Sequence, residues 1–156
     1  MDKIILWFSL GAFIALFVFS LRKSPMKEWI LAFFVTAYFA NFFGAIVAKL
    51  NLIKYPENFL SQYFSSSLLF ELIAFPVINV YFYQTSYRSG WLGIIIQCVL
   101  YTSGITVLEV ILKKYTNLIV YMNWNWLITF ISVLLFMLGV RLLLELQKRV
   151  SKNERI

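Results

Sequence analysis

Five long apolar stretches make up most of the chain, and they constrain its fold more than any other feature. They cover residues 4–21, 29–48, 65–83, 91–111 and 126–146. A helix that crosses the hydrocarbon core of a bilayer needs about 20 mostly apolar residues. In lipid the backbone must satisfy its own hydrogen bonds, and continuous apolar runs favour helices over β-barrel strands. The sequence therefore predicts an all-α fold, an integral membrane bundle of five transmembrane helices.

The composition argues against a soluble protein. Of the 156 residues, 62% are hydrophobic and 13% are charged. Ordinary soluble domains are about 45–50% apolar and about 25% charged. A chain of this size keeps a large share of its surface exposed, so it could not hide so much apolar area from water. The lipid bilayer is therefore its expected partner.

The expected organisation is one domain with a tail. Residues 1–146 are predicted to form a single transmembrane domain, and residues 147–156 a polar cytoplasmic tail that frays. The first stretch exceeds the ~7–15 apolar residues of a signal peptide, and no A-x-A cleavage site follows it, so we expect a retained helix. Trp7, Trp29, Trp91 and Trp126 lie near helix starts, where tryptophan is expected at the membrane interface.

Basic residues are distributed unequally between the two sides that five spans would create. One side collects Arg22, Lys23, Lys27, Arg88, Lys148, Arg149, Lys152 and Arg155, and the other collects Lys3, Lys49, Lys54, Lys113 and Lys114. Cytoplasmic loops are enriched in lysine and arginine. This bias predicts an outside N-terminus and a cytoplasmic C-terminus.

The two outer loops, residues 49–64 and 112–125, are long and rich in aromatic and aliphatic residues. They are too polar to span a bilayer and too apolar to extend freely into water. We expect them to lie on the outer membrane surface as short amphipathic helices or turns. The functional alternative is a lid over an outward-facing pocket.

Several classes of function are excluded by missing residue types. The chain has no histidine, which removes histidine-based catalysis and histidine metal sites. Cys98 is the only cysteine and Asp2 the only aspartate, so an internal disulfide, a cysteine zinc site and an aspartate pair are excluded. We expect no enzyme activity, no cofactor and no metal. The net charge of +7 comes mostly from loops and the tail, so nucleic acid is not an expected partner.

The second stretch carries small residues at helical spacing, at Thr36, Ala40, Gly44 and Ala48. Small residues let helix backbones approach closely in lipid. The stretch is therefore expected to pack tightly within the chain and to form the centre of the bundle. The alternative is a homodimer that packs through the Gly44 and Ala40 face.

Polar residues within the outer halves of three stretches form the candidate intramembrane site. Its main members are Glu71, Glu109 and Asn41, which five alternating spans would place at one level. Ser67 is in helical phase with Glu71, and Thr102, Thr106 and Lys113 are in phase with Glu109. Pro76 lacks a backbone N–H and should open space beside Glu71.

Two interpretations of the acidic pair stay open. In the structural one, Glu71 and Glu109 pair with Lys113, Lys114 or neighbouring hydroxyl and amide groups. In the functional one, they form a ligand, ion or proton site that is open to the outside, since intramembrane carboxyls often mark such pathways. Near the inner side, Arg141 is expected to pair with Glu145 or Glu28 in a structural role.

Three segments carry a resemblance to a known group of proteins. They are WILAFFVTAYFANFFG (29–44), SSSLLFELIAFPVINVYFYQT (65–85) and VLEVILKKYTNLI (107–119). Together they resemble a family of small, uncharacterised multi-pass membrane proteins of spore-forming bacilli and clostridia. The resemblance implies a bacterial cytoplasmic-membrane protein and assigns no functional residue.

Two functions follow from these features as hypotheses. The first is a small non-enzymatic membrane protein that binds an apolar ligand or a membrane protein partner through its outer half. The second is a transporter subunit, or a proton or ion pathway, that uses Glu71 and Glu109. The chain is short, no internal repeat that would support a transporter stands out, and a continuous polar path would have to come from an oligomer.

Overall fold

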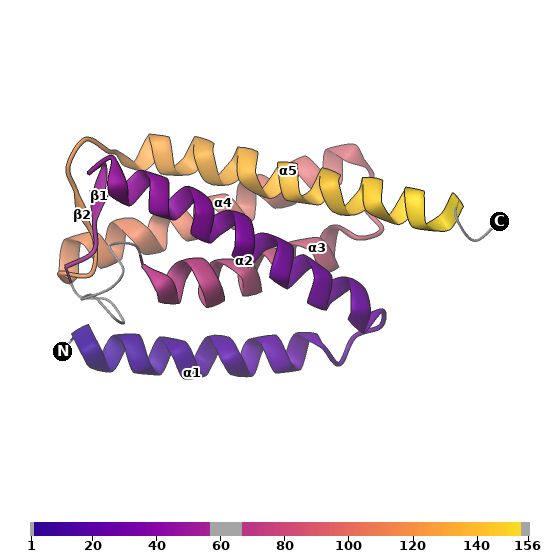
Figure 1. Ribbon diagram of the computed structural model, residues 1–156, viewed down its shortest axis with the longest axis horizontal. Helices are drawn as coiled ribbons and strands as arrows, with labels where there is room; N and C mark the ends of the chain where they lie inside the picture. The colour runs from indigo at the N-terminus through magenta and orange to yellow at the C-terminus, as the bar shows by residue number, and fades with distance from the viewer. Residues whose placement is uncertain (1, 57–66, 154–156) are drawn as a thin grey trace.

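The computed structural model describes residues 2–56 and 67–153 and shows an almost entirely helical chain (Figure 1). Its elements in order are α1 (Asp2–Ser20), α2 (Met26–Lys49), β1 (Ile53–Lys54), the π-helical turn η1 (Phe70–Ala74), α3 (Phe75–Ser86), α4 (Trp91–Tyr115), β2 (Val120–Tyr121) and α5 (Trp126–Asn153). The predicted all-α class is confirmed. Within the described residues, α1, α2, α4 and α5 are each long and apolar enough to cross a membrane.

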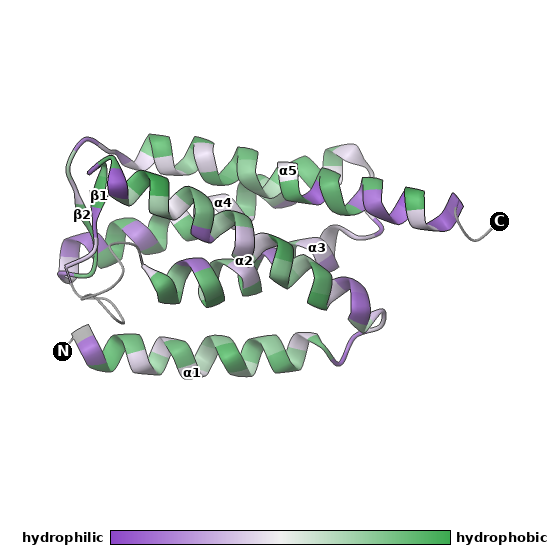
Figure 2. Cartoon of the chain, in the orientation of Figure 1, coloured by the Kyte–Doolittle hydropathy of each residue, from purple (hydrophilic) through white to green (hydrophobic). Residues whose placement is uncertain are grey.

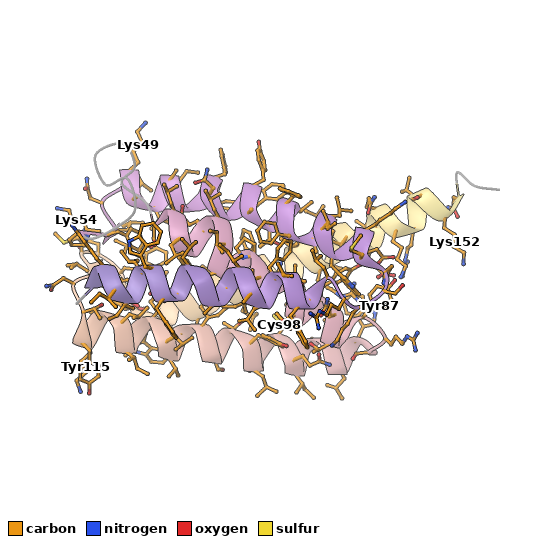
Figure 3. The ribbon with its side chains drawn as sticks, turned by 90° about the horizontal axis from the view of Figure 1, so that it is seen from below. Lys49, Lys54, Tyr87, Cys98, Tyr115 and Lys152 are labelled. Atoms are coloured by element: carbon orange, nitrogen blue, oxygen red, sulfur yellow. The ribbon has the colours of Figure 1, made fainter. Side chains whose placement is uncertain are left out.

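The helices lie side by side along one axis, which gives the molecule two distinct ends (Figure 1). The strand end holds the start of α1, the last turns of α2 and α4, and both strands. The turn end holds the α1–α2 and α3–α4 connections and the end of α5. Lys49, Lys54 and Tyr115 lie at the strand end, and Tyr87 and Lys152 lie at the turn end (Figure 3).

The centre of the bundle is α3, and the prediction that the second stretch occupies it was wrong. Most of α3 is buried, including Phe75, Val77, Val80 and Phe82. It packs against α1, α2 and α4, so little of its circumference is left exposed. The row of small residues on α2 instead covers one side of α3 and η1.

The outward faces of the long helices are apolar. Phe8, Phe34, Leu92 and Leu135 are each more than 60% exposed, at 77%, 64%, 73% and 62%. Hydrophobic residues dominate the helices, and polar ones gather toward the two ends (Figure 2). Such a surface fits a protein that is embedded in a membrane.

Three of the four tryptophans expected at the membrane interface are exposed. They are Trp7, Trp91 and Trp126, and their interfacial position stays a prediction. Trp29 is buried: its Nε1 donates a hydrogen bond to the Lys23 carbonyl over 2.8 Å. Its ring packs edge-on against aromatic rings of α3 and the following turn, so it belongs to the protein core.

The two loops at the strand end pair with each other, which the expectation of amphipathic helices or turns did not include. β1 and β2 form an antiparallel ladder in which Ile53 faces Tyr121 and Lys54 faces Val120. Asn51 adopts a left-handed backbone conformation, with φ 53°, where the chain turns from α2 toward β1. The pairing of the two strands gives hydrogen-bond partners to backbone N–H and C=O groups that lie beyond the ends of α2 and α4. Residues 57–64 of the first loop lie outside the described residues.

The C-terminal segment differs from the predicted frayed tail. α5 continues without interruption through residues 147–153, so this part of the tail is helical. Arg155 lies outside the described residues.

A π-helical turn replaces regular helix just before Pro76. The N–H of Phe75 donates to the carbonyl of Phe70, five residues earlier. Pro76 follows in the first turn of α3, where its missing N–H disturbs the fewest helical bonds. The predicted local disruption next to Glu71 thus takes the form of a widened turn.

Because Gly44 has no side chain, the π-helical turn can pack directly against the backbone of α2. A Cβ atom placed on Gly44 would overlap the carboxyl group of Glu71, so that group packs directly on the α2 backbone. Ala40, one turn earlier, is buried in the core cluster that contains Phe75. The expected close packing of α2 within the chain is confirmed, whereas a homodimer through Ala40 and Gly44 stays a prediction.

Replacing Gly44 with leucine should lower stability because the new side chain needs the space that Glu71 occupies. The expected loss is about 1–3 kcal/mol, as for other overpacked sites. Gly104→Leu is the matched control, since a Cβ there meets no atom within 4 Å. Thermal unfolding in detergent would compare the two variants. Equal stability of both would contradict the close contact.

Candidate functional site

A cavity of about 570 Å³ lies between α2 and α5 and extends from the strand end, and we name it the acidic cavity. Its walls are mainly apolar residues of α2 and α5, and its polar members are Tyr55, Glu71, Glu109, Trp124, Thr129 and Ser132. The two predicted carboxyls therefore line the same space, although they come from η1 and α4. Their common level in the outer half of a membrane stays a prediction.

Glu71 reaches the cavity from the π-helical turn. The residue is 4% exposed, and its carboxyl group rests on Gly44. Its backbone N–H donates to the Ser67 carbonyl over 2.9 Å, which continues the helix by one turn before η1. The carboxyl group is thus held at the cavity wall by its burial, by its contact with Gly44 and by the helical hydrogen bond of its own backbone.

Tyr55, in the loop after β1, lies near both acidic residues. Its phenol has a pKa raised above 10.0, first because the group is buried and then because the charges of Glu71 and Glu109 disfavour a phenolate. The neutral phenol retains its O–H, so Tyr55 adds a hydroxyl group to the polar lining that Trp124, Thr129 and Ser132 also supply.

Glu109 is held by hydroxyl groups from two other elements. Its Oε1 accepts hydrogen bonds from the Tyr121 hydroxyl of β2 and, over 2.8 Å, from the Thr129 hydroxyl of α5. The indole Nε1 of Trp124 donates to the same threonine oxygen over 2.7 Å. This network joins α4, β2 and α5 and directs the carboxyl group into the cavity.

The predicted lysine partners do not form ion pairs with the acidic residues. The Nζ of Lys113 lies 4.0 Å from the centroid of the Tyr121 ring, and that of Lys114 lies 5.5 Å from the Tyr115 ring. In the described part of the chain, the ion pairs are Arg141–Glu145 and Arg149–Glu145. Glu109 is bonded by the Tyr121 and Thr129 hydroxyls instead, which is the hydroxyl pairing that the structural interpretation also included.

The remaining predicted members lie outside the cavity lining. Asn41 is half-buried on α2, and Ser67 contributes its backbone rather than a lining side chain. Thr102 donates to the Met137 sulfur over 3.8 Å, and Thr106 donates to the Thr102 carbonyl over 2.9 Å. Both threonines are buried and serve helix packing, so the polar stripe marks the inward face of α4 without belonging to the site.

The inner charged residues separate into two groups. The Arg141 guanidinium pairs with Glu145 over 3.1 Å and lies 4.7 Å from the Tyr83 ring centroid, so the expected pair is confirmed. Glu28 instead accepts hydrogen bonds from the hydroxyls of Tyr87, over 2.9 Å, and Tyr83, over 3.4 Å. The alternative pairing of Arg141 with Glu28 is not found.

Five residues of the site were missed at the level of sequence: Tyr55, Tyr121, Trp124, Thr129 and Ser132. Three of them come from the aromatic loops, which had suggested only a cap or a lid. Their role depends on the pairing of β1 with β2, which places distant loop residues beside α4 and α5. The aromatic content of both loops indicated that these residues contact other parts of the chain, but it did not identify which residues they contact.

The chemistry of the cavity favours an amphiphilic occupant with a hydrogen-bond donor. Ionised carboxylates only accept hydrogen bonds. No lysine or arginine of the described residues lines the space. Within those same residues, no group of three or more histidine, cysteine, aspartate or glutamate side chains could hold a metal ion.

The chain matches no protein-family model, no curated protein and no solved structure. Functional inference therefore depends on the acidic cavity and its lining.

The contact between Glu109 and Tyr121 should be visible in a tyrosine titration. Burial, the hydrogen bond to Glu109 and its charge raise the pKa of Tyr121 above 10.0. Its contribution to stability is therefore complete below pH 10 and is lost as the pH rises toward the raised pKa. Phenolate absorbance, taken as the difference between wild type and Tyr121→Phe, should show late ionisation that Glu109→Gln moves to lower pH. An unchanged titration in Glu109→Gln would contradict the contact.

Proposed function

We propose that the protein is a non-enzymatic membrane protein that binds an amphiphile in the acidic cavity. The apolar chain of the ligand lies against α2 and α5, and its head group, an ammonium or a hydroxyl, donates hydrogen bonds to Glu71 and Glu109. One observation carries the proposal: two carboxyl groups from separate elements line a single, otherwise mainly apolar cavity.

Size and access support a ligand from the lipid phase. A volume of about 570 Å³ falls in the range of about 300–1,000 Å³ typical of small-molecule sites. Phe43 of α2 and Leu135 and Leu143 of α5 line the cavity and are 51%, 62% and 48% exposed. The cavity therefore borders the outer apolar surface between these two helices, where an alkyl chain can enter sideways.

The cost of intramembrane carboxyls also supports a ligand. A charged side chain costs about 2.5–3.5 kcal/mol at the centre of a membrane helix on insertion scales, and less toward the helix ends, where these two carboxyls lie. Packing alone would be served by apolar residues at these positions. A donor head group would recover part of this cost by bonding to the carboxyls.

A proton or cation pathway is the alternative that the acidic pair also supports. Beyond the cavity, the next buried polar contact toward the turn end is the hydrogen bond from Asn79 Nδ2 to Thr36 Oγ1, over 2.7 Å. Thr36 in turn donates to the Ala32 carbonyl over 2.7 Å, so the Asn79 amide nitrogen and the Thr36 hydroxyl already bond within the protein. The amphiphile site needs no continuous polar path and is the simpler function.

The proposed setting is a bacterial cytoplasmic membrane, crossed five times, with η1 and α3 as the third crossing. The resemblance to membrane proteins of bacilli and clostridia supports the setting. Most basic residues of the described chain gather at the turn end: Arg22, Lys23, Lys27, Arg88, Lys148, Arg149 and Lys152. The turn end is therefore proposed to be cytoplasmic, with the N-terminus and the acidic cavity on the outer side.

Single added cysteines should reveal this orientation. Cys98 is buried and can be replaced by alanine to give a cysteine-free background. In intact cells an impermeant thiol reagent should label Lys3→Cys but should label Lys152→Cys only after the cells are permeabilised. Labelling of Lys152→Cys in intact cells would contradict the orientation.

Fluorescence quenching should detect the amphiphile directly. A brominated long-chain amine is expected to quench Trp124, which lines the cavity, and Trp124→Phe identifies that share of the signal. Glu71→Gln combined with Glu109→Gln should weaken binding about tenfold or more, since hydrogen bonds to charged groups contribute about 1.5–3 kcal/mol each.

Two controls define the outcome of this experiment. Glu28→Gln makes the same chemical change at the opposite end and should leave binding unchanged. A brominated fatty acid of equal chain length should bind more weakly than the amine, because no lysine or arginine among the described residues lines the cavity. Equal affinity of the double variant and wild type, with loss of thermal stability alone, would show that the carboxyls are structural.

A further inference from the structure

A second cavity, of about 430 Å³, lies at the turn end between the first turns of α2 and the last turns of α5, and we name it the basic pocket. Its polar lining consists of Lys27, Glu28, Tyr83, Gln147, Lys148, Ser151 and Lys152, and its apolar lining of Pro25, Leu31 and Leu144. The turns of α2 and α5 that line it lie at the opposite end of the bundle from β1 and β2 (Figure 1).

The charge of the basic pocket is dominated by three lysines. Lys27 comes from α2, and Lys148 and Lys152 come from successive turns of α5. Neither Lys27 nor Lys152 belongs to an ion pair of the described residues. The Lys148 ammonium donates a hydrogen bond to the Tyr87 hydroxyl over 2.5 Å, which fixes its position beside the pocket.

The acidic residues near these lysines are already engaged by other groups. The two carboxylate oxygens of Glu28 accept hydrogen bonds from Tyr87 and Tyr83. Glu145 pairs with Arg141 and Arg149. Glu28 is the one acidic residue in the described lining, so the basic pocket keeps an excess of positive charge.

We propose that the basic pocket binds a phosphate-bearing anion, namely the head group of an anionic phospholipid. The lysine ammonium groups supply charge, and Gln147 and Ser151 supply further donors for phosphate and head-group oxygens. Leu31 and Leu144 form an apolar wall that suits the first carbons of the acyl chains. Free phosphate has the same charge chemistry but would leave this wall unused.

The level of the pocket along the bundle also favours a lipid. The turn end is where the apolar helix surfaces give way to polar residues (Figure 2). Lys152 lies on the part of α5 that extends farthest at this end (Figure 3). Basic pockets between helices at this depth are suited to anionic head groups.

Native mass spectrometry with equal amounts of phosphatidylglycerol and phosphatidylcholine would test the site. The wild-type protein in detergent should retain phosphatidylglycerol preferentially. Lys27→Gln, Lys148→Gln and Lys152→Gln combined should weaken this preference about tenfold or more, since each basic residue near an anionic lipid adds about a fivefold gain. The matched control is Lys49→Gln, Lys54→Gln and Lys114→Gln, which removes equal charge at the strand end and should preserve the preference.

Further arms separate the possible sources of the effect. Arginine at the same three positions should restore the preference. The double variant Lys27→Gln with Lys152→Gln should also weaken it, and this variant leaves the Lys148–Tyr87 contact intact. Phosphorus NMR with inorganic phosphate tests the soluble source, and lysine-dependent binding there would support a phosphate site that does not require a lipid. Equal preference in the wild type and the glutamine variants, with no binding of inorganic phosphate, would overturn the proposal.

Discussion

The close contact between the Glu71 carboxyl and Gly44 is the interaction on which the rest of the site depends. A side chain larger than hydrogen at position 44 would occupy the place of the carboxyl group. The widened turn before Pro76 presents Glu71 to α2, and glycine allows α2 to receive it. With η1 against α2, the space between α2 and α5 remains open as a cavity and has a carboxyl group in its wall.

A second acidic group is brought to that cavity by longer-range contacts. Glu109 is oriented by Tyr121 and Thr129, and Tyr121 reaches it because β2 pairs with β1. The acidic cavity and the basic pocket both lie between α2 and α5, at opposite ends of the same pair of helices. An amphiphile with a donor head group would match the charge of the acidic cavity. A separate lipid with an anionic head group would match the charge of the basic pocket.

The sequence predicted the features that depend on the spacing of residues along one helix and on the low polarity of lipid. The all-helical class, the close packing at Gly44 and Ala40, the Arg141–Glu145 pair and the convergence of Glu71 and Glu109 follow from apolar length, helical period and the cost of charge in lipid. Asn41 lies outside the cavity lining, because a similar depth along the bundle does not fix the direction in which a helical side chain points. Thr102 shows the same limit, since an inward face serves packing against α5 as readily as a site. The contacts of Tyr121 and Trp124 depend on loop pairing and could not be read from helical phase.

An experimentally determined structure in a lipid environment would test the central claim most directly. The account predicts elongated density between α2 and α5, with its polar end within hydrogen-bond distance of Glu71 or Glu109. The Glu71 carboxyl group should still pack on Gly44. A structure in which α2 and α5 close against each other and leave no cavity, or in which either carboxyl group faces the acyl chains, would contradict it.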